Sequence, residues 1–174
     1  MKNVVTKNTV NITFISLVIL IFTRLIPHPP NFTALIAVSI YVPMLCGQKH
    51  LYGVILAMIL TDLFLGFHPY IFWTWGSIIF IGTISKFYHS VFVRYTSVIL
   101  GTLAYYIITN FGVWLAGDYG YSISGIFACY TVAIPFLGNS MAAAIFFATI
   151  FELLFLFKPI RETIKRINPT LLKI

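Results

Sequence analysis

Charged side chains are scarce in this sequence of 174 residues: Asp, Glu, Lys and Arg make up 9%, whereas hydrophobic residues make up 60%. A soluble globular domain carries about 25% charged residues. A surface with so little charge needs lipid rather than water as its solvent, so the composition excludes a soluble domain and predicts a membrane protein. The length suits a single transmembrane domain, residues 1–174, with short loops and no second domain.

Cysteines and acidic residues are fewer still, with two and four respectively. Cys46 and Cys129 form no metal-ligand spacing, and the topology derived below puts them at opposite faces of the membrane, so we expect no disulfide between them. The sequence also contains no motif for a serine nucleophile with its base, and Asp62 has no second intramembrane aspartate to pair with. We therefore expect no enzymatic activity, no resident cofactor and no metal.

The net charge of +7 raises the question of nucleic-acid binding. Outside the apolar stretches, the sequence has no basic helix face that alternates with base-stacking aromatic residues. An excess of Lys and Arg in cytoplasmic loops, which orients membrane proteins, explains the charge better. We expect the lipid bilayer as a partner and no nucleic acid.

Six apolar segments follow one another along the chain, at about residues 12–26, 32–46, 51–65, 70–85, 95–116 and 131–157. A helix needs about 20 residues to cross the hydrocarbon region, so the second to fourth segments are short. They fit as tilted helices or in a thinned bilayer, and buried re-entrant segments are the alternative. The sequence predicts an all-α, polytopic protein with six transmembrane helices.

The first apolar segment follows two lysines, as in a signal peptide, but no small-residue cleavage site comes after it. We therefore expect it to be a retained span. The tail at residues 158–174 places isoleucines and a leucine at helical spacing among basic residues, namely Ile160, Ile164, Ile167 and Leu171. This pattern predicts a short amphipathic helix on the inner membrane surface.

The basic residues predict the orientation. Ten of the eleven Lys and Arg residues precede the first span, follow the sixth, or lie between spans two and three or four and five. With six spans all these segments share one side of the membrane. The positive-inside rule then places both termini in the cytoplasm. A five-span topology would separate the basic tail from the N-terminal lysines.

Arg24 is the exception, because it lies on the outer side. Intramembrane charged and amide side chains are costly unless they are paired or face a wet cavity, and they mark functional candidates. Four spans place such side chains at a similar outer depth: Arg24, Asp62, Asn110 and Asn139. We predict one shared polar pocket that opens outward. The alternative is a structural Arg24–Asp62 ion pair with amides that satisfy helix ends. Glu152 lies toward the inside, where we expect it to reach Lys158 or the membrane interface.

The predicted outer loops carry further candidate contacts. The loop at 27–31 is stiffened by prolines, and the loop at 117–125 is rich in glycine and tyrosine and suits a movable lid. The loop candidates are His28, Asn31, His68, Asp118 and Tyr119. The two loop histidines with Asp62 give no recognisable metal-ligand spacing.

Tryptophans at the outer side offer flat surfaces for a ring. Trp73 and Phe72 fit an aromatic belt at the membrane interface. Trp75 and Trp114 lie deeper in their spans, so we expect them to stack against a bound solute.

Four ordered blocks of the sequence resemble an uncharacterised family of small bacterial integral membrane proteins. They read RLIPHPPNFT at 24–33, TDLFLGFH at 61–68, TNFGVWL at 109–115 and CYTVAIPF at 129–136, with Asn139 after the last. The resemblance covers nearly the whole chain after residue 15. It implies a multi-pass protein of the bacterial inner (cytoplasmic) membrane.

That family in turn resembles the substrate-binding S components of energy-coupling-factor (ECF) transporters. The resemblance implies an S-component-like bundle of six helices with both termini inside. It also implies outer loops that close over a vitamin or metal ion, and a coupling subunit with two ATPases as partners. One feature differs: the span at 12–26 lacks the Ala-x-x-x-Ala pattern with which many S components dock their coupling subunit.

Together these observations predict a membrane protein that captures a small vitamin-like or other polar-aromatic solute from the outer side for import. Arg24 would anchor an anionic or carbonyl group, and Asp62 would orient it or bind a cation of the ligand. Asn110 and Asn139 would supply hydrogen bonds. Cobalamin is one conceivable solute, with Cys129 or His68 as axial ligand to cobalt. A proton-linked carrier and a structural or assembly protein are the alternatives.

Overall fold

The computed structural model describes the backbone of residues 2–85 and 90–168, and the side chains of that range from residue 7 onward. It is 84% helical, and the described residues contain no strand. The predicted all-α class is therefore confirmed. Lys86 and Lys173, which belong to the charge pattern, and Leu171, which belongs to the predicted amphipathic helix, lie outside the described residues.

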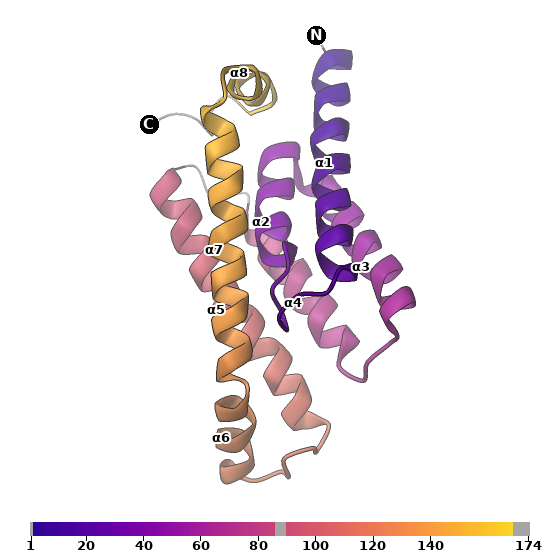
Figure 1. The fold of residues 1–174 in the computed structure, drawn as a ribbon, viewed down its shortest axis with the longest axis vertical. Coiled ribbons are helices and arrows are strands. Elements are labelled where there is room, and N and C mark those ends of the chain that lie inside the picture. Colours follow the sequence, from indigo (N-terminus) through magenta and orange to yellow (C-terminus); the bar gives the residue numbers. More distant parts are fainter. Residues whose placement is uncertain (1, 86–89, 169–174) are drawn as a thin grey trace.

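The described residues form eight α-helices and one short 3-10 helix, η1 (Figure 1). In chain order they are α1 (Lys2–Leu25), α2 (Leu35–Cys46), η1 (Gln48–His50), α3 (Leu51–Leu65), α4 (Ile71–Ile84), α5 (Val91–Leu115), α6 (Ile123–Val132), α7 (Ile134–Leu156) and α8 (Lys158–Ile167). Four helical segments are long and apolar enough to cross a membrane: 7–25, 48–65, 91–115 and 134–156. α2, α4 and α6 are apolar but shorter. The protein is thus a membrane protein by length and composition of its helices.

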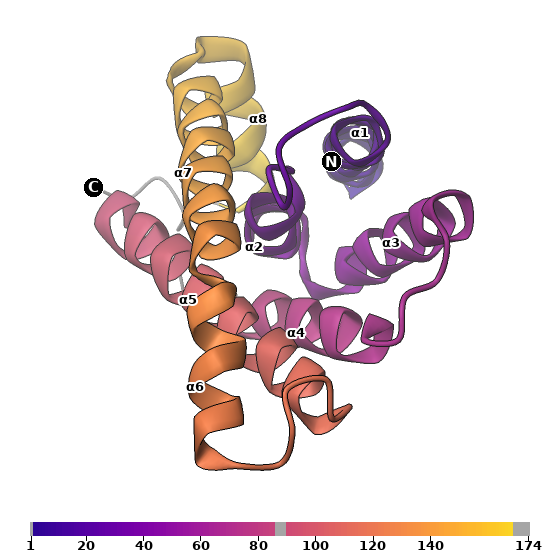
Figure 2. The same ribbon diagram turned by 60° about the horizontal axis from the view of Figure 1, so that its bottom comes forward.

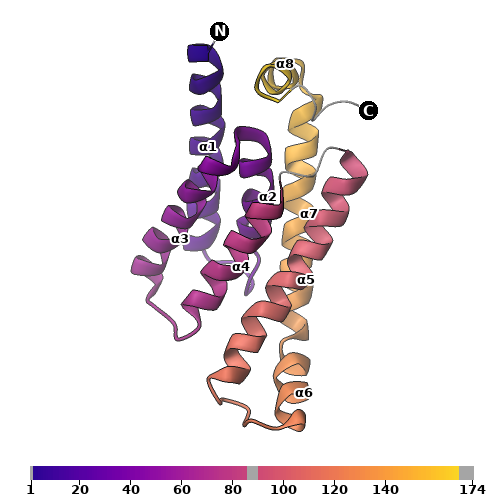
Figure 3. The ribbon, with the colours of Figure 1, turned by 180° about the vertical axis from the view of Figure 1, so that it is seen from behind.

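The helix α2 lies at the centre of the bundle, and each of its 12 residues is buried. It contacts α1, α3, α4, α5, α7 and α8, and Figure 2 shows it enclosed by its neighbours. A helix that is apolar on all sides is expected to be buried on all sides, which explains why 35–46 shows no amphipathic pattern. Seen from behind, α4 lies between α3 and α5 (Figure 3).

The predicted span boundaries hold best where loops are short. α3 matches 51–65, and α4 differs from 70–85 by one residue at each end. The prediction of one span at 131–157 after a loop is wrong at its outer end, because residues 123–132 form the separate helix α6. The Ser122 side chain caps α6 by accepting a hydrogen bond from the backbone N–H of Gly125 at 3.0 Å. Pro135 has no N–H to continue the helix, so α7 starts anew after Ala133.

The predicted amphipathic helix is confirmed as α8, which crosses the end of α7 near the start of α1 (Figure 1). Its apolar side faces the protein: Ile164 is 1% exposed, and Ile160 packs on the same core. The Asn168 side chain donates a hydrogen bond to the backbone carbonyl of Met44 at 3.3 Å. The basic residues of α8 are exposed, namely Lys158, Arg161, Lys165 and Arg166. The helix α8 therefore packs on the protein through its apolar side and exposes its basic side chains on the other side.

Candidate functional site

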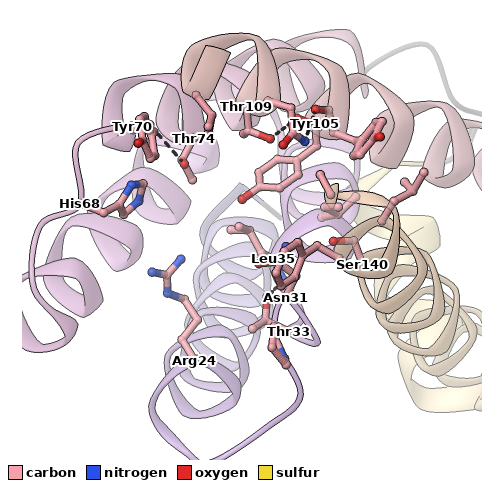
Figure 4. A pocket seen from close by; sticks show the side chains of 18 of the residues that line it. Arg24, Asn31, Thr33, Leu35, His68, Tyr70, Thr74, Tyr105, Thr109 and Ser140 are labelled. Carbon is pink, nitrogen blue, oxygen red and sulfur yellow. Dashed lines mark hydrogen bonds between the residues drawn. The ribbon is translucent and has the colours of Figure 1, made fainter. Parts of the chain in front are cut away.

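A cavity of about 440 Å³ is lined by residues at the end of the bundle remote from α8, and Figure 4 shows it from close by. Its wall is formed by the end of α1, the 26–34 loop, the start of α2, the turn between α3 and α4, the C-terminal half of α5 and the α6–α7 junction. The side chains of Asn31 and His68 are exposed at its rim. The elements that meet here are the ones that the sequence predicted to share the outer side.

Arg24 and Asp62 form an ion pair, which is the arrangement that the structural alternative to a shared pocket called for. Nη2 of Arg24 donates to Oδ1 of Asp62, and Nη1 donates to the sulfur of Met58. The other carboxylate oxygen of Asp62 accepts a hydrogen bond from Nε1 of Trp75 at 2.8 Å. The two ionic side chains are only 13% and 2% exposed. Arg24 lines the cavity. Asp62 and Trp75 are not among the described lining residues; Asp62 bonds to Arg24 from behind the wall, and Trp75 bonds to Asp62.

Five predicted site residues line the cavity: Arg24, His28, Asn31, His68 and Asn110. They come from α1, two loops and α5, so the cavity gathers residues that are far apart in the sequence. The amide Nδ2 of Asn110 donates to the backbone carbonyl of Tyr106 at 2.8 Å. Nδ1 of His28 lies 2.7 Å from the carbonyl oxygen of Pro29, which fixes the ring at the rim.

Two further predicted residues lie one contact away from the cavity. Asp118 accepts a hydrogen bond from the hydroxyl of Tyr70, a lining residue, and so ties the turn before α4 to the loop after α5. The thiol of Cys129 is buried and donates to the backbone carbonyl of Asn110 at 3.4 Å. Neither side chain is among the lining residues that the structure describes.

Trp114, Tyr119 and Asn139 are also outside the described cavity lining. Trp114 packs in an aromatic cluster, with ring centroids 5.6 Å from Phe111 and 6.2 Å from Tyr121. Asn139 lies at the level of the cavity along α7, as predicted, but its side chain is on a different face of the helix from the one that lines the cavity. The next residue, Ser140, faces the cavity, and successive residues of a helix point about 100° apart.

Sequence reasoning missed a polar stripe on α5. Tyr105 and Tyr106 line the cavity together with Thr109 and Asn110, one helical turn later. Residues four apart share a helix face, so this spacing was a readable signal. Thr33, Thr74 and Ser140 add hydroxyl groups to the wall (Figure 4).

A second buried ion pair, Arg94–Glu152, lies in the half of the bundle nearer to α8, which we call the inner half to distinguish it from the outer half that holds the cavity. Nε and Nη2 of Arg94 donate to the two carboxylate oxygens of Glu152 at 2.6 and 2.7 Å. The Tyr41 hydroxyl donates to the same carboxylate at 2.6 Å. Two expectations from the sequence are therefore wrong: Arg94 is a buried residue of α5 rather than part of a loop, and Glu152 meets Arg94 instead of reaching Lys158 or the interface.

The fold and the cavity define an all-helical membrane protein with a charge-paired polar cavity at one end. The chain belongs to a family of unknown function, DUF6580, which matches residues 3–163. The resemblance carried by the four sequence blocks is thereby confirmed as membership of an uncharacterised family. No curated protein and no solved structure matches the chain. The likeness to S components of ECF transporters stays a prediction.

Proposed function

We propose that the protein crosses the bacterial inner membrane six times, with both termini in the cytoplasm and the cavity open to the outside. The start of α1 and α8 lie at the same end of the bundle (Figure 1), which supports an even number of crossings. α2 has 12 residues, or about 18 Å of helix, against about 30 Å of hydrocarbon. Its ends are covered by other parts of the protein, so a short span is compatible with the bilayer.

The exposed basic residues support this orientation. Those that the structure describes at the α8 end are Lys7, Lys49, Lys158, Arg161, Lys165 and Arg166. Arg24, at the cavity end, is charge-paired with Asp62. An excess of free positive charge at one end is the pattern that the positive-inside rule assigns to the cytoplasm.

Labelling of introduced cysteines tests the orientation. Both native cysteines are buried, so background reaction is expected to be low. We expect Phe67→Cys, in the exposed turn after α3, to react with a membrane-impermeant maleimide on intact spheroplasts. Arg161→Cys, on α8, is expected to react only after permeabilisation. Labelling of both positions from the same side would rule out the six-span orientation.

We further propose that the cavity binds a small solute from the outer side and that the protein helps to import it. The observation that carries this proposal is a buried Arg24–Asp62 pair in the wall of a cavity of about 440 Å³. Ionisable residues are kept within membrane spans mainly for function. Small-molecule pockets occupy about 300–1,000 Å³. The cavity is at the lower end of that range, which favours a compact solute over one as large as cobalamin.

Import by an S-component-like route, with a coupling subunit and ATPases, is the form of transport that the sequence resemblance suggests. A lock that joins α1 to α3 is the competing role, because the Arg24–Asp62 pair already satisfies most of its charge within the protein. The two roles differ in whether the empty volume beside Arg24 is used.

Filling the cavity separates them. Ser140 lines the cavity and is buried, whereas Ala142, on the same helix, is exposed. We expect wild-type protein purified from its own cells to retain a solute in native mass spectrometry. Ser140→Phe is expected to lower its occupancy by about tenfold or more, because the ring takes the solute's volume. Ala142→Phe is the matched control and is expected to retain the solute. Equal occupancy in Ser140→Phe and wild type would remove the cavity as the binding site.

A further inference from the structure

The wall of the cavity carries little net charge. Arg24 is the one Lys or Arg among the lining residues that the structure describes, and the carboxylate of Asp62 is bonded to it. The remaining polar lining consists of histidines, amides and hydroxyl groups, including His28, His68 and Asn110. At Arg24, an incoming molecule therefore meets a charge-compensated ion pair instead of a free cation.

The guanidinium of Arg24 still has N–H groups to offer, because it carries five and two of them are used in bonds to Met58 and Asp62. Its Nε is buried and has no hydrogen-bond partner among the described residues. The two terminal nitrogens already contact Met58 and Asp62. Arg binds carboxylates and phosphates best through a forked, two-point contact, and here both terminal nitrogens already have protein partners. Figure 4 shows the guanidinium pointing toward the space between His68 and Tyr105.

An anion would gain little in this position. In the cavity, the attraction of an anion to Arg24 is reduced by repulsion from Asp62, which is paired with Arg24 behind the wall. The anion would still lose its hydration on entering the cavity. A neutral acceptor, such as a carbonyl oxygen or a ring nitrogen, avoids that loss and satisfies the unpaired donor.

We propose that the cavity selects an electrically neutral solute that presents a hydrogen-bond acceptor to the guanidinium of Arg24, and that Asp62 excludes small oxyanions. The proposal rests on the proposed solute-binding function and names its substrate class. The apolar part of the wall, with Leu35, Ile36, Val113 and Leu137, suits a hydrocarbon or ring face on the same solute.

Two probes with the same ring and different charge test the selectivity. Binding of benzamide and of benzoate is measured by calorimetry on wild type, on Asp62→Asn and on Glu162→Gln. The last variant removes one negative charge from the exposed surface of α8 and controls for net charge. Asp62→Asn is expected to raise the affinity for benzoate by about tenfold or more, because Arg24 loses its compensating charge. Benzamide is expected to bind wild type more tightly than benzoate does.

A wild type that prefers benzoate overturns the proposal, as does an Asp62→Asn variant that gains no affinity for it. If Asp62→Asn does not fold, the solute retained by the wild type decides instead. A neutral retained molecule supports the proposal, and one with a carboxylate or phosphate overturns it. A retained anion whose occupancy falls in Ser140→Phe would leave the binding function intact while removing this selectivity. The two ideas therefore fail separately.

Discussion

Arg94→Ala is expected to lower the free energy of unfolding by about 3–5 kcal/mol, because it leaves a buried carboxylate without its partner. Arg94 is 2% exposed, and its guanidinium makes a two-point contact with Glu152. Removing it leaves the carboxylate of Glu152 without its counter-charge among α2, α5 and α7. Reversible unfolding in detergent micelles, followed by circular dichroism, measures the loss. Arg166→Ala, on the exposed face of α8, is the control and is expected to stay within about 0.5 kcal/mol of wild type.

Restoring neutrality is expected to recover most of that stability. The variant Arg94→Met/Glu152→Leu/Tyr41→Phe removes both charges and the hydroxyl that donates to them. Replacing a buried ion pair by apolar groups of similar volume is often neutral or stabilising. Phe at position 41 keeps the stacking on Phe151, whose ring centroid lies 4.7 Å from that of Tyr41. A triple variant as unstable as Arg94→Ala would show that the ion pair itself, rather than the unpaired charge, supports the inner end.

This inner cluster shows where sequence reasoning stopped. Arg94 and Glu152 are 58 positions apart, and nothing local in either segment points to the other. Arg94 read as one of the loop charges because it lies in the first turn of α5, at the edge of the apolar run. The depth of a residue along its span was readable, but the rotation of the helix was not. The same limit explains Asn139, whose neighbour Ser140 faces the cavity.

The placement of Arg24 and Asp62 near each other was predictable because burying a charge in a membrane is costly unless a partner lies close by. A basic residue that breaks the positive-inside pattern needs a partner, and Asp62 was the carboxylate at matching depth. The apolar runs predicted α3 and α4 because turns bound them closely. The start of α6 was missed because Ser122, which caps it, lies within a segment rich in glycine and tyrosine that was interpreted as a loop. The sequence pattern thus predicted the helices and how deep each polar residue lies along its span. The contacts between helices became visible only in the folded structure.

The outer pair gives the second large effect, and here stability and binding are expected to separate. Arg24→Met alone is expected to cost about 3–5 kcal/mol, because Asp62 would stay buried without its counter-charge. Arg24→Met/Asp62→Leu/Trp75→Phe removes both charges and the indole donor to Asp62, so most of that loss is expected to return. Solute occupancy in the triple variant is nevertheless expected to fall by about thirtyfold, or about 2 kcal/mol, because Arg24 is gone from the wall.

The inner triple variant is the matched control for this experiment. It removes an ion pair of the same kind at a place that does not line the cavity, so it is expected to keep the solute at wild-type occupancy. If Arg24 and Asp62 only join α1 to α3, the outer triple variant will fold and retain the solute as well as the inner one does. If Arg24 contacts the solute, both triple variants will be stable, but the outer triple variant will have lost most of its solute and the inner one will not. Unfolding and native mass spectrometry on the same two preparations thus distinguish a lock from a binding site.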